Sequence, residues 1–158
     1  MTEDQEELIS YLGKVSATIS SIDNVDSLVL EISKIIEELI KVEVTAIYFW
    51  DPRLKKLILH KAKGLTEDDI KNAEASAMDR HPGWVFRNKK LFHVPDTEKD
   101  DGVISKSVKR SFKVRSRLYI PVVNMEKALG TLGFASLEPN AFSNYHTVSY
   151  THLTLPTN

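Results

Sequence analysis

One short stretch, RHPGWVFRNKKLFHVPDTEKDDG at residues 80–102, gathers several side chains suited to holding a ligand. Trp84 can stack on a planar molecule and donate one hydrogen bond through its indole N–H. Arg87 carries a fixed fork of N–H donors that matches a carboxylate or a phosphate. His81 is placed to close the mouth of a pocket, and His93 to point into it. We therefore predict that this stretch forms the wall and rim of a binding pocket.

Each of these side chains also has a purely structural interpretation. Trp84 can be a core residue beneath a loop, and together with Phe92 it can fill the cavity rather than line it. His81 can be a solvated loop residue. His93 lies in the apolar segment LFHV, where it can satisfy a backbone carbonyl inside the core. The sequence leaves both interpretations open for each residue.

The arginines of this region divide in the same way. Arg87 can serve a ligand, or it can pair with Asp96 or Glu98. Arg115 and Arg117 enter a strand-like segment, so one of them can reach into the pocket toward an anionic ligand. The predicted ligand-binding residues are therefore Trp84, Arg87, His93, Phe92, Arg115, Arg117 and His81.

The stretch 106–117 is basic and contains no acidic residue. A nucleic-acid-binding protein would use such a patch on phosphates. However, Ile104, Val108 and Phe112 are four residues apart and predict a helix over 103–113 with an apolar face. The lysines then form its solvated side, and we favour this interpretation over nucleic-acid binding. The basic residues are Lys106, Lys109, Arg110, Lys113, Arg115 and Arg117.

Motifs for catalysis or metal binding are absent from the sequence. It has no cysteine, which excludes disulfides, thiolate metal sites, cysteine nucleophiles and thioether-linked cofactors. His81 and His93 are twelve residues apart with no clear carboxylate ligand between them, so no metal site is predicted. No Ser-His-Asp elbow, phosphate-binding Gly loop or zinc-protease helix motif occurs. We therefore predict no catalytic residues and expect this chain not to be an enzyme.

Length and composition predict one cytoplasmic domain. The chain has 158 residues, 42% of them hydrophobic, and a net charge of −1 that selects no partner. Its acidic N-terminus, MTEDQEELIS, does not resemble a secretory signal. The apolar runs are far shorter than the roughly 18–20 residues that a membrane span needs. The lack of cysteine agrees with a cytoplasmic setting.

Hydrophobic periodicity predicts the elements that position these residues. Helical spacing covers 4–21 and 25–41, and the β-branched, aromatic run at 42–50 predicts a central strand. The expected later elements are strand 55–62, helix 66–78 capped at Thr66, a short helix after a break at Pro82 and Gly83, strand 91–94, helix 103–113, and strands 116–123 and 128–137. Glycines 130 and 133 indicate a bulge or close backbone approach.

Tight turns join most successive strands, and the central strands are apolar on both faces. The expected fold class is therefore α+β, with a largely antiparallel central sheet of five to six strands and helices on both faces. The segment 148–158, VSYTHLTLPTN, fits neither a helical stripe nor a strand alternation. It resembles a translated cloning read-through, so we expect a domain over 1–147, truncated before a closing helix.

These segments together resemble a GAF domain, a small ligand-sensing module of signalling proteins. The resemblance covers about residues 4–147. It is carried by two leading helices that run into TAIYFW, by HPGWVFRNKKLFHVPD, and by RSRLYIPVVNMEKALGTLGFASLEPNAFSN. The resemblance implies a PAS-like sheet with a pocket on the face opposite the terminal helices, beneath the segment 66–113.

The resemblance also narrows the ligand. Covalent bilin binding and the family's free methionine sulfoxide reductase activity both need cysteine, so neither applies here. A pattern similar to that of cyclic-nucleotide members occurs as Asn88, Lys89, Phe92 and Asp96, but it lies far from the position this pattern has in the family. Cyclic nucleotides are therefore disfavoured, and the cofactor is left unknown.

We accordingly predict a non-catalytic sensor that binds a small, anionic molecule between the sheet and residues 79–113. Ligand binding would shift the population of conformations and alter a homodimer interface formed by helices 4–21 and 25–41. The resemblance implies a downstream effector such as a histidine kinase of a two-component system, a cyclic-di-nucleotide enzyme or a transcriptional activator. The alternatives are a ligand-free dimerisation and coupling module, and nucleic-acid binding through 106–117.

Overall fold

The computed structural model describes residues 25–99, 112–124 and 126–142. The expected helix 4–21, residues 103–111 of the expected helix 103–113, and the tail 148–158 lie outside these residues. The last two residues of that second helix, Phe112 and Lys113, are described and are not helical. The helices are α2 (Val25–Leu39), α3 (Glu67–Ser76) and α4 (His81–Asn88), with the 3-10 turns η1 (Ala77–Asp79) and η2 (Thr97–Lys99). The strands are β1 (Val44–Asp51), β2 (Lys56–Lys63), β3 (Phe92–Val94), β4 (Ser116–Asn124) and β5 (Lys127–Ser136).

The five strands form one antiparallel sheet in the order β2-β1-β5-β4-β3. This confirms the expected α+β class and antiparallel sheet. Short hairpins join β1 to β2 and β4 to β5, as the turn residues predict. In the first hairpin the Asp51 carboxylate accepts hydrogen bonds from the backbone N–H groups of Arg53 and Leu54, at 2.8 and 3.1 Å. This local bond explains why an Asp begins the turn.

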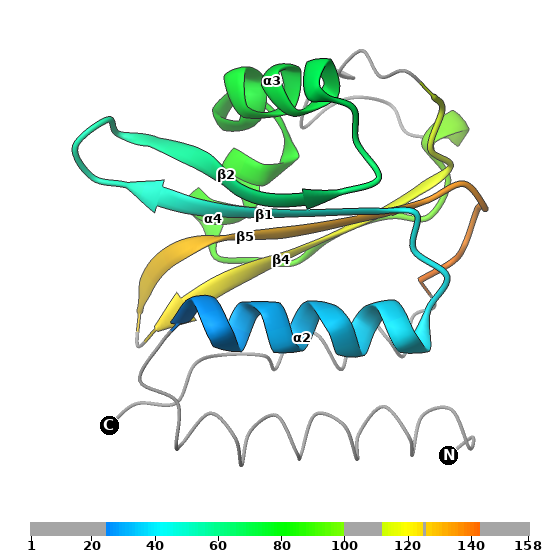
Figure 1. Cartoon of the computed structure of the whole chain (residues 1–158), viewed down its shortest axis with the longest axis horizontal. Coiled ribbons are helices and arrows are strands. Elements are labelled where there is room, and N and C mark those ends of the chain that lie inside the picture. The colour runs from blue at the N-terminus through cyan, green and yellow to red at the C-terminus, as the bar shows by residue number, and fades with distance from the viewer. Residues whose placement is uncertain (1–24, 100–111, 125, 143–158) are drawn as a thin grey trace.

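Helix α2 covers one face of the sheet (Figure 1). Its apolar stripe packs on alternate residues of β1, β4 and β5, because side chains of a strand alternate between faces. The helix ends two residues earlier than the sequence pattern predicts. The core on this face contains Val29, Ile32, Ile35, Ile36 and Ile40 from the helical segment, together with Ile47, Leu118, Ile120, Val122, Leu132, Phe134 and Phe142.

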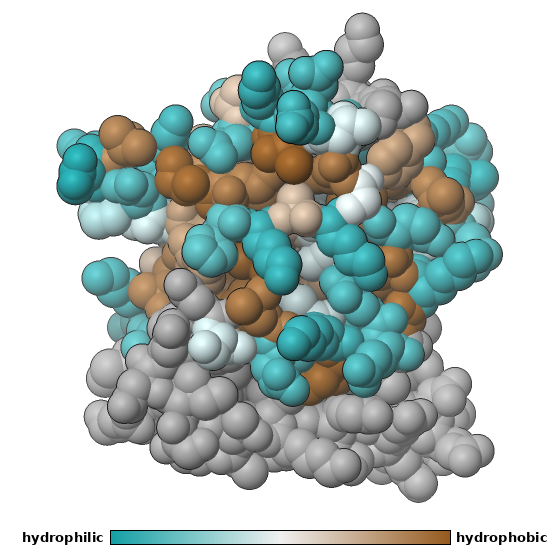
Figure 2. Space-filling view, in the orientation of Figure 1, coloured by the Kyte–Doolittle hydropathy of each residue, from teal (hydrophilic) through white to brown (hydrophobic). Residues whose placement is uncertain are grey.

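The other face of the sheet carries α3, η1 and α4, which confirms the expectation of helices on both faces (Figure 1). Thr66 caps α3 as predicted: its hydroxyl accepts from the N–H of Asp69, whose carboxylate accepts from the N–H of Thr66. Figure 2 shows hydrophilic side chains on the outside of α3 and hydrophobic ones gathered beneath it. Trp50 and Phe86 stack there with ring centroids 4.8 Å apart.

The expected chain break at Pro82 and Gly83 is wrong, because both residues belong to the first turn of α4. Proline is tolerated at this position, where a missing N–H costs no helical hydrogen bond. Gly83 lets the helix approach η1, since a Cβ there would collide with the backbone of Met78. The helix therefore starts three residues before Trp84 and lies directly against the preceding turn.

The glycines of β5 allow the close backbone approach that the sequence indicates. A Cβ at Gly130 would collide with the carbonyl oxygen of Tyr48 on β1. A bulge also interrupts the pairing of β4 and β5 between Val122 and Val123. At Gly133, a Cβ would lie 3.2 Å from the ring of Tyr119 on β4. The absence of a side chain at Gly133 leaves room above the sheet beside this ring.

Candidate functional site

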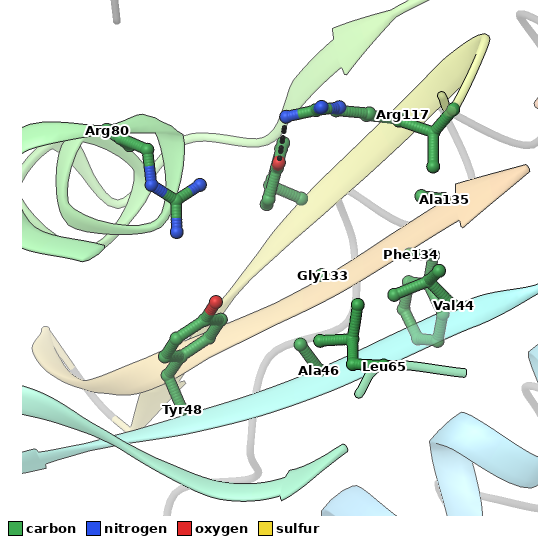
Figure 3. Close-up of a pocket in the computed structure, with 11 residues that line it drawn as sticks. Val44, Ala46, Tyr48, Leu65, Arg80, Arg117, Gly133, Phe134 and Ala135 are labelled. Carbon is green, nitrogen blue, oxygen red and sulfur yellow. Dashed lines mark hydrogen bonds between the residues drawn. The ribbon is translucent and has the colours of Figure 1, made fainter. Parts of the chain in front are cut away.

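A cavity of about 30 Å³ lies between the sheet and the helical layer formed by η1 and α4. This volume is enough for about two ordered water molecules. Side chains and backbone from β1, β4 and β5 form its floor, and the η1–α4 junction forms a wall (Figure 3). The described residues that line it are Val44, Ala46, Tyr48, Leu65, Arg80, Val114, Arg117, Tyr119, Gly133, Phe134 and Ala135.

Strand alternation places Arg117 and Tyr119 on the cavity face of β4. Their neighbours Leu118 and Ile120 face α2 and belong to its core. Tyr119 pairs with Gly133 of β5, so on that side no β5 side chain fills the space beside its ring. The guanidinium Nη1 of Arg117 lies 3.5 Å from the hydroxyl oxygen of Tyr119, at the outer limit of a hydrogen bond (Figure 3).

Arg80 approaches the cavity from the opposite side. It lies between η1 and α4 and is only 3% exposed. Its Nε donates to the hydroxyl of Ser76 at 2.7 Å, and its Nη2 donates to the carbonyl of Ala73 at 2.9 Å. These two bonds hold the guanidinium group so that it projects from the helical layer toward Tyr48 on β1 (Figure 3).

The cavity is positively charged. Two guanidinium groups line it, and the described lining residues include no carboxylate. The Nε of Arg117 is buried and has no hydrogen-bond partner among the described residues. A buried donor without an acceptor costs free energy, so such groups are uncommon unless they serve a ligand, an ion or water. The arrangement is suited to holding a group that carries negative charge and hydrogen-bond acceptors.

Three of the residues singled out in the sequence form an aromatic cluster beside the cavity. His81 stacks between Phe92 and Tyr119, with ring centroids 4.8 and 5.3 Å away, and Trp84 meets Phe92 edge-on at 5.4 Å. His81 is 4% exposed, so its interpretation as a solvated loop residue is wrong. None of the three lines the cavity, but His81 contacts Tyr119, which does.

His93 and Arg87 lie away from the cavity. His93 is on the α2 side of the sheet, with its ring edge-on to Phe142 at 6.3 Å. Its Nε2 is buried without a partner among the described residues, and burial lowers the pKa of its imidazole. Arg87 is exposed and donates to the carbonyl of Met78 at 2.7 Å, rather than pairing with Asp96 or Glu98.

The partner of those two acids is Arg115. Its Nη2 lies 3.2 Å from an Asp96 oxygen and 3.3 Å from a Glu98 oxygen. The hydrogen bond from Arg115 lowers the pKa of Asp96, and one from Lys113 at 2.8 Å lowers that of Glu98. Of the two arginines at the start of β4, Arg117 therefore lines the cavity, whereas Arg115 ties the segment after β3 to β4.

Three polar residues of the cavity lining, Tyr48, Arg80 and Tyr119, were not among the predicted binding residues. The two tyrosines stand among apolar strand residues, in AIYFW and LYIPVV, and a hydroxyl in such a place needs a polar partner. That pattern was available in the sequence. Arg80 directly precedes the stretch HPGW, but its inward direction depends on how η1 meets α4, which no local pattern indicates.

Comparison with known proteins identifies the family. A model of the GAF domain matches residues 23–151. The chain belongs to the GAF domain family. GAF domains are generally regulatory domains of signalling proteins that sense small molecules. No curated protein matches this chain.

Solved GAF structures share the fold. The GAF domain of an Acinetobacter phosphoenolpyruvate-protein phosphotransferase is similar at 20% identity, with a TM-score of 0.67, over 96% of this chain and 90% of that one. The free methionine-R-sulfoxide reductase of Neisseria meningitidis, solved with its substrate, is similar at 14% identity, with a TM-score of 0.69, over 94% and 84%. A GAF domain/HD domain protein from Geobacter sulfurreducens matches at 20% identity, with a TM-score of 0.61, over 84% and 88%.

The structure also bears on two other classes of partner. Within residues 25–99, 112–124 and 126–142, no helix has the length and apolar character needed to cross a bilayer. The same residues contain no cluster of three or more side chains arranged to hold a metal ion. In the described part of the basic stretch, Lys113 and Arg115 are paired with acids, and Arg117 lines the cavity.

Proposed function

We propose that this GAF domain is a sensor whose ligand occupies the cavity between the sheet and the η1–α4 layer. The single observation that carries the proposal is a cavity lined both by the buried Arg80 and by Arg117, whose buried Nε has no partner among the described residues. Family membership supports a regulatory role rather than catalysis. The proposal includes a cytoplasmic location and an effector elsewhere in the parent protein.

The sheet offers a short route from the cavity to α2. Arg117 and Tyr119 of β4 face the cavity. Leu118 and Ile120, which alternate with them along the strand, face the opposite side and pack against α2. A ligand that shifts β4 by a fraction of an ångström therefore changes the packing of α2 in the same step. In this proposal the ligand stabilises one of two packings of α2, and a homodimer interface involving α2 passes the change to the effector.

A ligand-free coupling module is the second candidate, and the size of the cavity favours it. About 30 Å³ accommodates only a small group without rearrangement. The aromatic cluster of His81, Trp84 and Phe92 packs beside this space and restricts it. On this view the domain binds nothing and transmits changes in dimer packing.

Thermal unfolding of the whole chain against small organic acids, amino acids and nucleotides separates the two candidates. We expect at least one compound to raise the melting temperature saturably, because a ligand that binds only the folded state stabilises it. Ala46→Leu places extra methyl groups in the cavity, since Ala46 is buried and lines it. The effect should disappear in this variant and persist in Ala75→Leu, where the alanine is exposed on α3.

The opposite result would favour the second candidate. If no compound shifts the melting temperature while the chain forms a concentration-dependent dimer in sedimentation equilibrium, the domain acts as a ligand-free coupling module. If a compound raises the melting temperature of Ala46→Leu and of Ala75→Leu equally, the ligand binds outside the cavity, and this would contradict the proposed site.

A further inference from the structure

We propose that the cavity binds a small oxyanion, a carboxylate or phosphate group, held between the guanidinium groups of Arg80 and Arg117. This inference rests on the proposed function, since it takes the cavity as the ligand site. It adds the chemical class of the ligand and the two residues that select it.

The balance of donors and acceptors is the first argument. A guanidinium group has five N–H donors and no acceptor. Arg80 uses its Nε and one Nη2 hydrogen for Ser76 and Ala73, which commits two of its five donors. Arg117 has a single long contact to the Tyr119 hydroxyl, and its Nε has none. The described cavity lining therefore offers more donors than acceptors, and an oxyanion supplies acceptors whereas a cation does not.

The balance of charge points the same way. Both arginines remain protonated at any physiological pH. Among the described residues, Asp96 and Glu98 bind Arg115, and Asp69 caps α3 and does not line the cavity. Two cations beside a partly apolar cavity are unfavourable unless a negative charge joins them. An oxyanion between them compensates both.

The size of the cavity restricts what enters it. Its floor and walls include Val44, Ala46 and Ala135, with no long polar side chain besides the arginines and tyrosines. A space of about 30 Å³ fits the charged end group of a small acid rather than a base or a sugar. A planar carboxylate or a phosphate also matches the fork geometry of a guanidinium group.

The two arginines belong to different layers of the fold. Arg80 comes from the junction of η1 and α4, and Arg117 comes from β4. A bound oxyanion would therefore bridge the helical layer to the sheet. Binding would stabilise the docking of α4, whose Trp84 then reports on the event.

The test uses the whole chain and defined sodium salts at constant ionic strength. Phosphate, acetate and succinate are compared with chloride, and acetamide and succinamide serve as neutral analogues of the two carboxylates. The readouts are the melting temperature, Trp fluorescence and the NMR resonance of each arginine Nε–H. We expect at least one oxyanion to stabilise the protein saturably and to shift the Arg117 Nε–H resonance, without a comparable effect of the amides.

Variants of the two arginines test whether oxyanion binding depends on Arg80 and Arg117. Arg117→Gln should weaken binding at least about tenfold, because it removes charge-assisted hydrogen bonds. Arg53→Gln is the matched control: it removes one positive charge from the exposed β1–β2 hairpin, outside the cavity lining, and should bind as the native chain does. Arg80→Lys keeps the charge but loses the fork. It should also weaken binding if it remains folded, as judged by its unfolding transition.

Three outcomes would overturn the inference. The first is that no oxyanion raises the melting temperature more than chloride does. The second is that Arg53→Gln weakens oxyanion binding as much as Arg117→Gln, which would mean that binding depends on the overall charge of the protein and not on Arg117. The third is binding of the neutral amides as tightly as of the acids. In that last case, loss of amide binding in Ala46→Leu would still show that the ligand binds in the cavity. The proposed function would then hold, and the proposed oxyanion site between Arg80 and Arg117 would be wrong.

Discussion

The hydroxyl of Thr131 on β5 donates a hydrogen bond to the carbonyl of Pro82 in the first turn of α4, with an oxygen–oxygen distance of 2.9 Å. Both residues are buried, and Thr131 has no exposed surface. The bond joins the helical layer directly to the sheet, close to the position where Arg80 leads into α4. The geometry of the cavity wall therefore depends on a contact that is itself shielded from water.

Thr131→Val keeps the shape of the side chain and removes the donor. We expect it to lower the free energy of unfolding by about 1 kcal/mol, as measured by urea denaturation, and to lower the hydrogen-exchange protection of α4. Thr131→Ser retains the hydroxyl and should leave that protection largely intact, even though the lost methyl group costs some stability. Unchanged α4 protection in Thr131→Val would show that this bond does not hold the helix to the sheet.

Arg117→Met should stabilise the protein when no ligand is added. The substitution removes a buried donor that has no described partner and replaces it with an apolar chain that reaches about as far as the arginine Nε. We expect the free energy of unfolding in chloride buffer to rise by about 1 kcal/mol, because sites built for ligands commonly sacrifice stability. Lower stability of the variant would mean that Arg117 has a structural partner, and this would remove the main argument for a binding role.

Asp96→Asn should destabilise the fold at neutral pH through its partner Arg115. The hydrogen bond from Arg115 is the largest cause of the lowered pKa of this carboxylate. The ionised carboxylate therefore stabilises the fold fully above its unfolded pKa of 3.8, and this contribution is lost as the pH falls through its folded pKa. The difference between variant and native protein should therefore shrink toward low pH, and also in high salt. Lys41→Gln, which breaks the exposed pair with Glu138, should have almost no effect.

The fold could be predicted from the sequence because each strand has a local explanation. The run VEVTAIYFW is β-branched and aromatic, and DPRL is a turn whose Asp51 caps it. Short connections explain the pairing of β1 with β2 and of β4 with β5, whereas β1 pairs with β5 across a long stretch of sequence. The start of α4 could not be predicted from Pro82 and Gly83 alone, because both residues also favour breaks. Their place inside the helix depends on the packing of Gly83 against Met78, which is a tertiary contact.

The site was harder to predict than the fold. The predicted stretch 80–102 contributes Arg80 to the cavity lining, whereas its His81, Trp84 and Phe92 form a cluster beside the cavity and do not line it. Side-chain alternation already implies that Phe92 and His93 face opposite sides of the sheet, so they cannot both line one pocket. Which of Arg87, Arg115 and Arg117 remains available depends on partners distant in sequence, such as Asp96 for Arg115.

His93 should make stability depend on pH in the window that begins at its unfolded pKa of 6.5 and extends down to its lowered folded pKa. Burial lowers the pKa of its imidazole below the unfolded value of 6.5, so the unfolded chain binds the proton more tightly. The stability associated with neutral His93 is fully present above pH 6.5 and is lost as pH falls through the folded pKa. Asp96 and Glu98 titrate below this window, because hydrogen bonds lower their pKa values.

His93→Phe isolates this contribution, because the other histidines are present in both proteins. The ring and its contact with Phe142 are retained, while the buried Nε2 is removed. Urea denaturation at several pH values should give a flatter stability profile for the variant, and the largest gain over the native protein at the acidic end. Parallel profiles would mean that His93 binds its proton equally well in the folded and unfolded chain, and an NMR titration of its imidazole would then show an ordinary pKa.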